Sequence, residues 1–268
     1  MTTAPRVVTT REAGIVEVRL ARPDKHNGLD VAMFEGLVAA GEALLDDRSV
    51  RVVVLHGEGA SFCAGLDFRA FMSGGPEVRE KLLARDPDRS PANLAQRVAW
   101  IWAELPVPVI AAVHGTCIGG GLQIALAADL RIVHPEAKLA VKEIHWGLIP
   151  DMSITRTLAR LVRLDVAKEL TFTGREFDGR EALALGIATR LADDPLTEAR
   201  ALAQQIAAQS PEAIRAAKTL WNQAPQLDDA TALALETELQ LPLLGSHNQL
   251  EAVQARFMKR APKFRDPG

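Results

Sequence analysis

The chain has 268 residues, a formal net charge of −3, and 48% hydrophobic against 24% charged residues, which is typical of a globular protein with a well-buried core. It has no basic block, so nucleic-acid binding has no electrostatic footprint, and its apolar runs are too short to span a bilayer. The two cysteines, Cys63 and Cys117, lack metal-ligand spacing. We therefore expect a cytoplasmic protein without a disulfide framework, without a nucleic-acid partner and without a membrane partner.

The first part of the chain alternates between strand and helix patterns. Short apolar or alternating runs predict strands at residues 7–10, 15–20, 51–56, 109–113, 130–133 and 138–141. Helical periodicity predicts helices over about 30–45, 92–105 and from residue 120 onward. Between these elements, residues 73–91 are polar and proline-rich, and they predict a mobile surface segment with a short helix that could cover a pocket.

The last part of the chain has a helical pattern almost throughout. Helices are predicted over residues 153–161, 165–171, 178–185, 196–209, 211–224, 228–240 and 246–259. Alternating strands and helices followed by helices alone predict an α/β protein with a helical appendage. We place the core at residues 1–195 and the C-terminal helical region at residues 196–268.

Two of the predicted strands end in glycine-rich turns. Residues 57–67 read GEGASFCAGLD, and residues 115–123 read GTCIGGGLQ. Glycine lets another atom approach the backbone closely, and a helix that starts at such a turn directs unpaired N–H groups outward. One interpretation is a pair of tight packing turns. The other is an oxyanion hole, in which the turns at Gly65–Leu66 and Gly119–Gly120 bring two N–H groups to one thioester or ester oxygen.

The loop at residues 142–151, KEIHWGLIPD, carries two carboxylates eight residues apart, Glu143 and Asp151. A carboxylate in an apolar setting has a raised pKa, which suits a base that works near neutral pH. Two plainer interpretations stay open. Glu143 could be a surface charge or the partner of Lys142, and Asp151 could cap the following helix in competition with Ser153.

Together these motifs resemble the crotonase superfamily, also called the enoyl-CoA hydratase/isomerase family, over most of the chain. ARPDKHNGLD at residues 21–30 is similar to the family's early loop, the two glycine turns are similar to its oxyanion turns, and EAVQARFMKRAPKF at residues 251–264 is similar to its closing segment. The resemblance implies a spiral of ββα units, a C-terminal helical trimerisation region, and a homotrimer or a dimer of trimers. It also implies acyl-CoA thioester substrates, with coenzyme A as part of the substrate and no separate cofactor or metal.

The same resemblance assigns site residues. The oxyanion donors fall on Leu66 and Gly120. Contacts with the substrate and its coenzyme A, some of them from a neighbouring subunit, fall on Lys25, His26, Ala64, Gly65, Asp67, Gly119, Lys259 and Phe264.

One departure from the family pattern bears on the reaction. Typical hydratases carry two glutamates, of which the second matches Glu143, but the first position holds Gln123. An amide can hold a water molecule but cannot exchange a proton at a useful pKa. The spacing of Glu143 and Asp151 is closer to the dienoyl-CoA isomerase branch, although that branch has an aspartate at the position of Gln123.

We therefore predict double-bond isomerisation of enoyl- or dienoyl-CoA through an enolate. Glu143 is the base, and Asp151 orients it or acts as a second acid. Enoyl-CoA hydration, 3-hydroxyacyl-CoA hydrolysis and a non-catalytic acyl-CoA-binding role remain as alternatives.

Overall fold

The computed structural model, which describes residues 4–85 and 90–268, contains one large and one small sheet. The large sheet has the order β1-β2-β3-β4-β6-β8, with β1 and β2 antiparallel and every other neighbouring pair parallel. Its strands are β1 (Val7–Glu12), β2 (Ile15–Leu20), β3 (Val52–Gly57), β4 (Val109–Val113), β6 (Leu130–Val133) and β8 (Arg190–Leu191). The small sheet pairs β5 (Thr116–Ile118) with β7 (Lys138–Ala140) in parallel.

Helices cover both faces of the large sheet. Alternate residues of β3 and β4 point into two separate apolar clusters, which explains why these strands are apolar at almost every position. The larger cluster packs under α1 (Val31–Leu45), α4 (Leu94–Glu104) and α5 (Gly120–Leu126). The smaller cluster is closed by Ala199, Ala203 and Ala207 of α9 (Pro195–Ala207), whose small side chains let the helix lie close to the sheet.

The segment at residues 73–91, predicted to be a mobile surface element with a short helix, contains one nine-residue helix. It begins at the end of α2 (Phe68–Ser73) and includes α3 (Gly75–Leu83), while residues 86–89 lie outside the described residues. The remaining short helices of the body are α6 (Ile154–Thr157), α7 (Leu164–Thr173) and α8 (Gly179–Ala184). The 3-10 helices are η1 (Pro23–Lys25), η2 (Glu143–Trp146), η3 (Leu158–Arg160) and, after α10, η4 (Ala224–Gln226). Among the described residues, no helix combines the length and the apolar character that a bilayer span requires.

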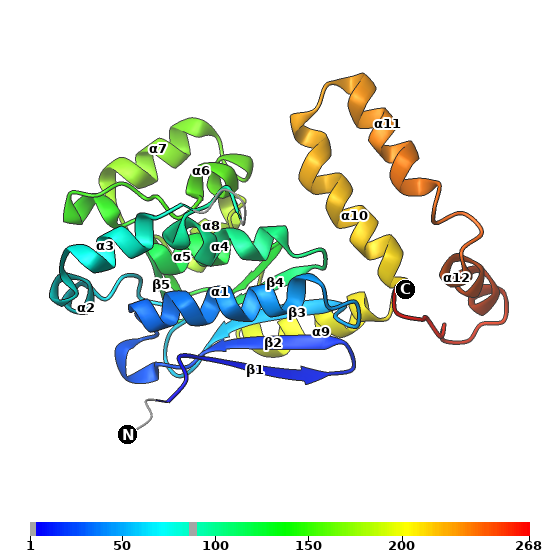
Figure 1. Cartoon of the computed structure of the whole chain (residues 1–268), viewed down its shortest axis with the longest axis horizontal. Coiled ribbons are helices and arrows are strands. Elements are labelled where there is room, and N and C mark those ends of the chain that lie inside the picture. Colours follow the sequence, from blue (N-terminus) through cyan, green and yellow to red (C-terminus); the bar gives the residue numbers. More distant parts are fainter. Residues whose placement is uncertain (1–3, 86–89) are drawn as a thin grey trace.

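Three helices project from the body on one side: α10 (Pro211–Gln223), α11 (Asp229–Gln240) and α12 (His247–Phe257) (Figure 1). The base of this projection is tied to the body by Lys218, a buried residue of α10 whose Nζ donates to Asp129 Oδ2 at 2.7 Å and to Val107 O at 2.9 Å. The predicted domain boundary at residue 196 stays a prediction, with α9 on the sheet and α10 to α12 beyond it.

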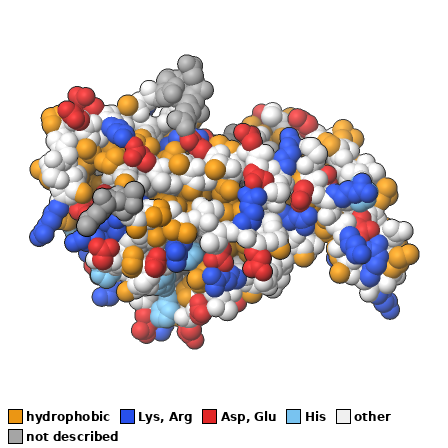
Figure 2. Space-filling view, turned by 60° about the horizontal axis from the view of Figure 1, so that its bottom comes forward, with side chains coloured by type: hydrophobic (Ala, Val, Ile, Leu, Met, Phe, Trp, Pro, Cys, Tyr) orange, Lys and Arg blue, Asp and Glu red, His pale blue; other side chains and the backbone are white. Residues whose placement is uncertain are grey.

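The projecting helices carry large apolar side chains that stay exposed in the described part of the chain. Trp221 is 74% exposed and Phe257 is 85% exposed. Figure 2 shows hydrophobic side chains on the right-hand lobe of the molecule, which these helices form. Exposed apolar surface of this kind marks an interaction site more often than a free surface.

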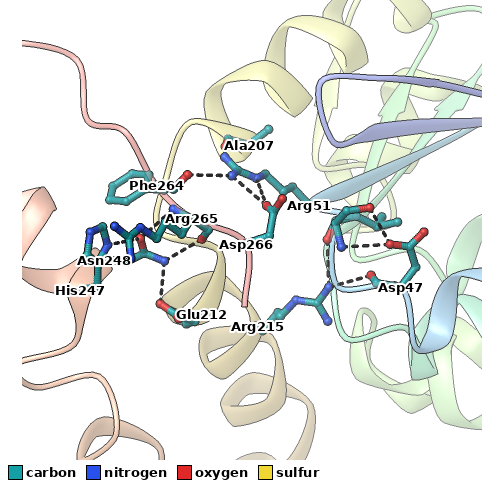
Figure 3. A network of polar contacts seen from close by, with 12 residues as sticks. Asp47, Arg51, Ala207, Glu212, Arg215, His247, Asn248, Phe264, Arg265 and Asp266 are labelled. Atoms are coloured by element: carbon teal, nitrogen blue, oxygen red, sulfur yellow. Dashed lines mark hydrogen bonds and ion pairs between the residues drawn. The ribbon is translucent and has the colours of Figure 1, made fainter. Parts of the chain in front are cut away.

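The C-terminal tail returns to the body through a polar network (Figure 3). Arg51, just before β3, donates to Ala207 O at 3.1 Å and to Phe264 O at 3.2 Å, and it pairs with Asp266 at 2.9 Å. Asn248 of α12 donates to Arg265 O at 2.8 Å. These contacts hold residues 264–266 at the end of the sheet where α10 begins.

Candidate active site

The two glycine turns lie side by side because the segment before the first turn pairs with β5. Cys63 and Cys117 form a parallel bridge, supported by backbone hydrogen bonds on both sides of it. Leu66 and Gly120 each follow a bridge partner by three positions. Equal spacing on two parallel segments therefore sets the two predicted oxyanion donors opposite each other.

The N–H groups of Leu66 and Gly120 make no hydrogen bond with any other described residue. Leu29 bonds to the residues on either side of Leu66, at Gly65 O and Asp67 N, so the N–H of Leu66 points away from Leu29. Both residues line the same cavity. Two unpaired donors at one cavity wall are what the predicted oxyanion hole requires.

Only glycine fits at Gly65 and Gly119. Their φ angles are +83° and +55°, in the left-handed region. A Cβ on Gly65 would lie 2.7 Å from Ile118 O, and a Cβ on Gly119 would lie 3.2 Å from Glu143 Oε1. Both glycines are therefore needed for a close approach, the first between the two turns and the second to the carboxylate.

The early loop, residues 21–30, is hydrogen-bonded to the segment that forms the first turn. Asn27 is fully buried, and its Nδ2 donates to Ser61 O at 2.8 Å and to Glu58 O at 3.0 Å. Its Oδ1 accepts from Arg22 N at 2.9 Å. These contacts explain the asparagine at residue 27, while the arginine at residue 22 acts through its side chain, whose Nη1 donates to Gly28 O at 2.9 Å.

Five of the predicted coenzyme A contacts, Gly65 among them, lie in this loop and the first turn. Ala64 lines the cavity and donates its N–H to His26 O at 2.9 Å. Lys25 is exposed at the end of η1. Asp67 caps α2 by accepting from Ala70 N at 3.1 Å, and it pairs with Arg22 at 2.9 Å. The carboxylate of Asp67 is thus already engaged in holding the turn.

Lys259 and Phe264, the other two predicted contacts from outside the turns, are not brought to the cavity by this chain. Lys259 is exposed after α12, and Phe264 belongs to the tail network beside Arg51 (Figure 3). Neither residue lines the cavity. A contribution from them to coenzyme A binding would have to come from a neighbouring subunit, as the resemblance implies.

The cavity beside the two turns has a volume of about 580 Å³. The lining includes the two turns, Gln123, and the loop that carries Glu143 and Asp151. It also contains apolar side chains that the sequence did not mark: Phe34, Phe68, Phe71, Leu82, Leu83 and Ala95. Their periodic apolar pattern is the same as that of ordinary core residues, so the sequence contains no signal that separates them.

Glu143 and Gln123 form the polar centre of the cavity. Gln123 Nε2 donates to Glu143 Oε1 at 2.6 Å, and Gln123 Oε1 accepts from Met152 N at 2.8 Å. Because both ends of the amide are engaged, its orientation is defined. The other carboxylate oxygen, Glu143 Oε2, is buried and has no hydrogen-bond partner among the described residues.

The electrostatic setting raises the pKa of both loop carboxyls. Burial raises the pKa of Glu143, and the nearby charge of Asp151 adds to this, while the hydrogen bond from Gln123 opposes it. Burial also raises the pKa of Asp151. A carboxyl whose pKa is raised toward neutral pH is suited to proton transfer.

The structure also decides between the interpretations of this loop. Lys142 pairs with Glu176 and not with Glu143, so the expectation that Glu143 serves as its partner is wrong. Asp151 does not cap α6. Ser153 occupies the N-cap position, but its φ is 64° and its side chain makes no capping hydrogen bond, so that expectation is also wrong.

An aromatic contact joins two of the segments that line the cavity. Phe68 and Trp146 stack with ring centroids 3.9 Å apart, which joins the start of α2 to the Glu143 loop at the cavity wall.

Cys63 is fully buried, and its burial raises the pKa of the thiol to about 12, which does not suit a nucleophile. Among the described residues, no three His, Cys, Asp or Glu side chains gather in a way that could hold a metal ion.

Comparison with known proteins agrees with this architecture. The family model described as Enoyl-CoA hydratase/isomerase matches residues 10–267. The chain is 33% identical to "Enoyl-CoA hydratase domain-containing protein 2, mitochondrial" of Homo sapiens, over 97% of this chain and 88% of that protein. It is 32% identical to "Methylglutaconyl-CoA hydratase, mitochondrial" of Mus musculus, over 94% of this chain and 80% of that protein.

Among solved structures, the chain is similar to an enoyl-CoA hydratase from Bacillus anthracis, with a TM-score of 0.88 and 30% identity over 97% of this chain and 98% of the other. An enoyl-CoA hydratase from Mycobacterium smegmatis has a TM-score of 0.86 and 31% identity, over 97% of this chain and 99% of the other. The predicted crotonase-like α/β fold is therefore confirmed. The chain belongs to the enoyl-CoA hydratase/isomerase family of the crotonase superfamily.

Proposed function

We propose that the chain isomerises a double bond in enoyl- or dienoyl-CoA thioesters, with Glu143 as the base. The observation that carries this proposal is the buried, unpartnered Glu143 Oε2 in a cavity that also contains the free N–H groups of Leu66 and Gly120. A buried acceptor without a partner is costly, and a substrate C–H or O–H is a group that it can meet.

The proton transfers of this reaction take place between the substrate and side chains of this chain. The thioester oxygen accepts hydrogen bonds from Leu66 N and Gly120 N, so that charge is stabilised when the enolate forms. Glu143 takes a proton from the carbon next to the thioester carbonyl or from the γ-carbon, and the electron pair moves into the conjugated system. A proton then returns to another carbon of the chain from Glu143 or from Asp151, and the double bond is displaced with no net change in composition.

Gln123 is a positioning residue in this mechanism. Its amide cannot exchange the proton, but it fixes one oxygen of Glu143, while the other, Oε2, has no partner among the described residues. It also ties the base to Met152 and so to the segment that carries Asp151. This arrangement favours a single base assisted by a second carboxyl over a symmetric pair of glutamates.

Hydration of enoyl-CoA is the second candidate, and the names of the relatives favour it, since the human, mouse and bacterial proteins compared above are named as hydratases or hydratase-domain proteins. The amide of Gln123 has a second N–H beyond the one given to Glu143, and this N–H could hold a water molecule. Glu143 would then activate that water for addition to the double bond.

One ultraviolet assay separates the candidates. The protein is mixed with 2-enoyl-CoA, 3-enoyl-CoA and dienoyl-CoA esters. Loss of enoyl absorbance means hydration, a change in conjugation means isomerisation, and released thiol means hydrolysis. The expected result is a change in conjugation that Glu143→Gln abolishes while the ester still binds. Unchanged turnover in Glu143→Gln would refute Glu143 as the base under either reaction.

We also propose that the chain works as a homotrimer or a dimer of trimers in the cytoplasm. The exposed apolar side chains of α10 to α12 support an assembly, because a monomer would leave them in water. Light scattering of the purified protein gives the mass that tests this.

A further inference from the structure

The helix α3 contributes to the cavity one charged side chain that the proposed reaction does not use. Arg79 lies on α3 and lines the cavity together with Leu82 and Leu83 of the same helix. These positions are three and four residues apart, so they share one helical face. Phe34 and Leu82, which also line the cavity, are 2% and 5% exposed. A guanidinium thus stands on the face that is otherwise suited to the acyl chain.

The other charges that line the cavity do not neutralise this guanidinium. Lys142 is a cation that is paired with Glu176, and neither of the two carboxyls that line the cavity, Glu143 and Asp151, forms an ion pair with Arg79. Arg79 itself makes no hydrogen bond or ion pair with any described residue. It is therefore a cation with its donors free that lines the same cavity as the predicted oxyanion turns and Glu143.

We propose that Arg79 determines the acyl specificity by binding a carboxylate at the far end of the acyl group. The preferred substrates are then coenzyme A thioesters of unsaturated dicarboxylic acids. This proposal rests on the proposed function and adds the substrate class. A guanidinium is a planar fork that matches the two oxygens of a carboxylate, and it would offset the repulsion between a distal carboxylate and the pair Glu143 and Asp151.

The phosphates of coenzyme A are the other anions that a free arginine could bind. The position of Arg79 favours the acyl carboxylate, because its helical face is shared with Leu82 and Leu83. The predicted coenzyme A loop, at Lys25 and His26, contributes no residue to the cavity. The experiment must nevertheless separate the two anions, and matched esters do so because they share the same coenzyme A.

Calorimetric titration with saturated esters makes this test without turnover. Adipoyl-CoA and hexanoyl-CoA have acyl chains of equal length, and only the first ends in a carboxylate. The ratio of their dissociation constants is measured for the unmodified protein, for Arg79→Met and for Lys81→Met. Lys81 is the matched control, since it is a cation on the same helix that pairs with Glu35 and does not line the cavity.

We expect Arg79→Met to lower the preference for adipoyl-CoA over hexanoyl-CoA by about 10-fold, the lower end of the range for a charged hydrogen bond because Arg79 is partly in solvent. Lys81→Met should leave the ratio unchanged. The same comparison is repeated with shorter and longer acyl chains, so that one of the distal carboxylates lies within reach of the Arg79 side chain. Arg79 is exposed on its helix and methionine is a good helix former, so circular dichroism should show an unchanged fold.

Three results would overturn the proposal: an unchanged ratio in Arg79→Met at every chain length, an equal weakening of both esters, which would assign Arg79 to the coenzyme A phosphates, or the same loss in Lys81→Met. A clear contrast in binding, without turnover of the corresponding unsaturated dicarboxylic acyl-CoA ester in the ultraviolet assay, would refute the proposed reaction alone. Turnover without the contrast would refute the role of Arg79 alone.

Discussion

The replacement of Gly65 by alanine tests whether the contact between the two glycine turns controls the reaction. The added Cβ would lie 2.7 Å from Ile118 O, whereas ordinary contacts begin at 3.4 Å. Because Ile118 leads directly into Gly119 and Gly120, the first turn and the second must separate by about 0.7 Å to accommodate it. The two N–H groups would then no longer converge on one oxygen.

The cost of this change can be divided into two parts. An alanine at φ +83° is destabilised by about 1–2 kcal/mol relative to glycine, partly offset by about 0.4–1 kcal/mol from the stiffer unfolded chain. A displacement approaching 1 Å at a reacting centre costs about 100-fold in rate. We therefore expect a small loss of stability and a loss of kcat of about 100-fold.

Gly245→Ala is the matched control, because Gly245 has φ +74° and open space where its Cβ would lie. The assay compares kcat on an enoyl-CoA ester and Tm for both variants. The prediction is a similar fall in Tm for the two variants and a fall in kcat for Gly65→Ala alone. If Gly65→Ala keeps kcat within about threefold of Gly245→Ala, the convergence of the turns is not what limits catalysis.

Three further predictions concern single contacts. Gln123→Leu removes the hydrogen bond that lowers the pKa of Glu143, so the acidic limb of the pH–kcat profile should move to higher pH, and an unmoved limb would contradict this. In Glu143→Gln, a carboxyl whose pKa is raised by folding is lost. The parent loses stability as pH rises above the ordinary glutamate pKa of 4.5, because the buried carboxyl must then ionise. The Tm of the variant should therefore exceed that of the parent at neutral pH but not in acid. A Tm difference that does not change with pH would refute the burial argument. Lys218→Met leaves Asp129 without its buried cation and should cost about 3 kcal/mol in urea unfolding, while a loss below about 1 kcal/mol would show that the joint to α10 does not depend on this pair.

The sequence was sufficient to predict the architecture because burial leaves regular patterns. The strands β3 and β4 are buried on both faces and are apolar at almost every position, and the helices show the expected spacing. Two strands were missed. β5 is only three residues long and lies between glycines, and its partner β7 follows about twenty residues later, so no local pattern marks it. The two-residue strand β8 is missed for the same reason.

The site was predictable only where a residue type is itself a signal. Glycines that must approach other backbone atoms, and carboxylates in an apolar loop, can be recognised in the sequence. The bond between Gln123 and Glu143 joins two segments twenty residues apart and could not be predicted, nor could the pairing of Lys142 with Glu176. Arg79 was missed because an arginine on a polar helix is usually solvated, and only the fold turns its face toward the cavity.

The most direct test of the central claim follows hydrogen exchange on the substrate. A saturated or enoyl-CoA ester is incubated with the protein in heavy water, and deuterium at the carbons next to the thioester and at the γ-position is followed by nuclear magnetic resonance. Proton transfer by Glu143 predicts deuterium at one of these carbons with the unmodified protein and none with Glu143→Gln, although the ester binds both proteins. Equal exchange by the two proteins, or no exchange by either while the ester is bound, would contradict the claim that Glu143 moves a proton in this cavity.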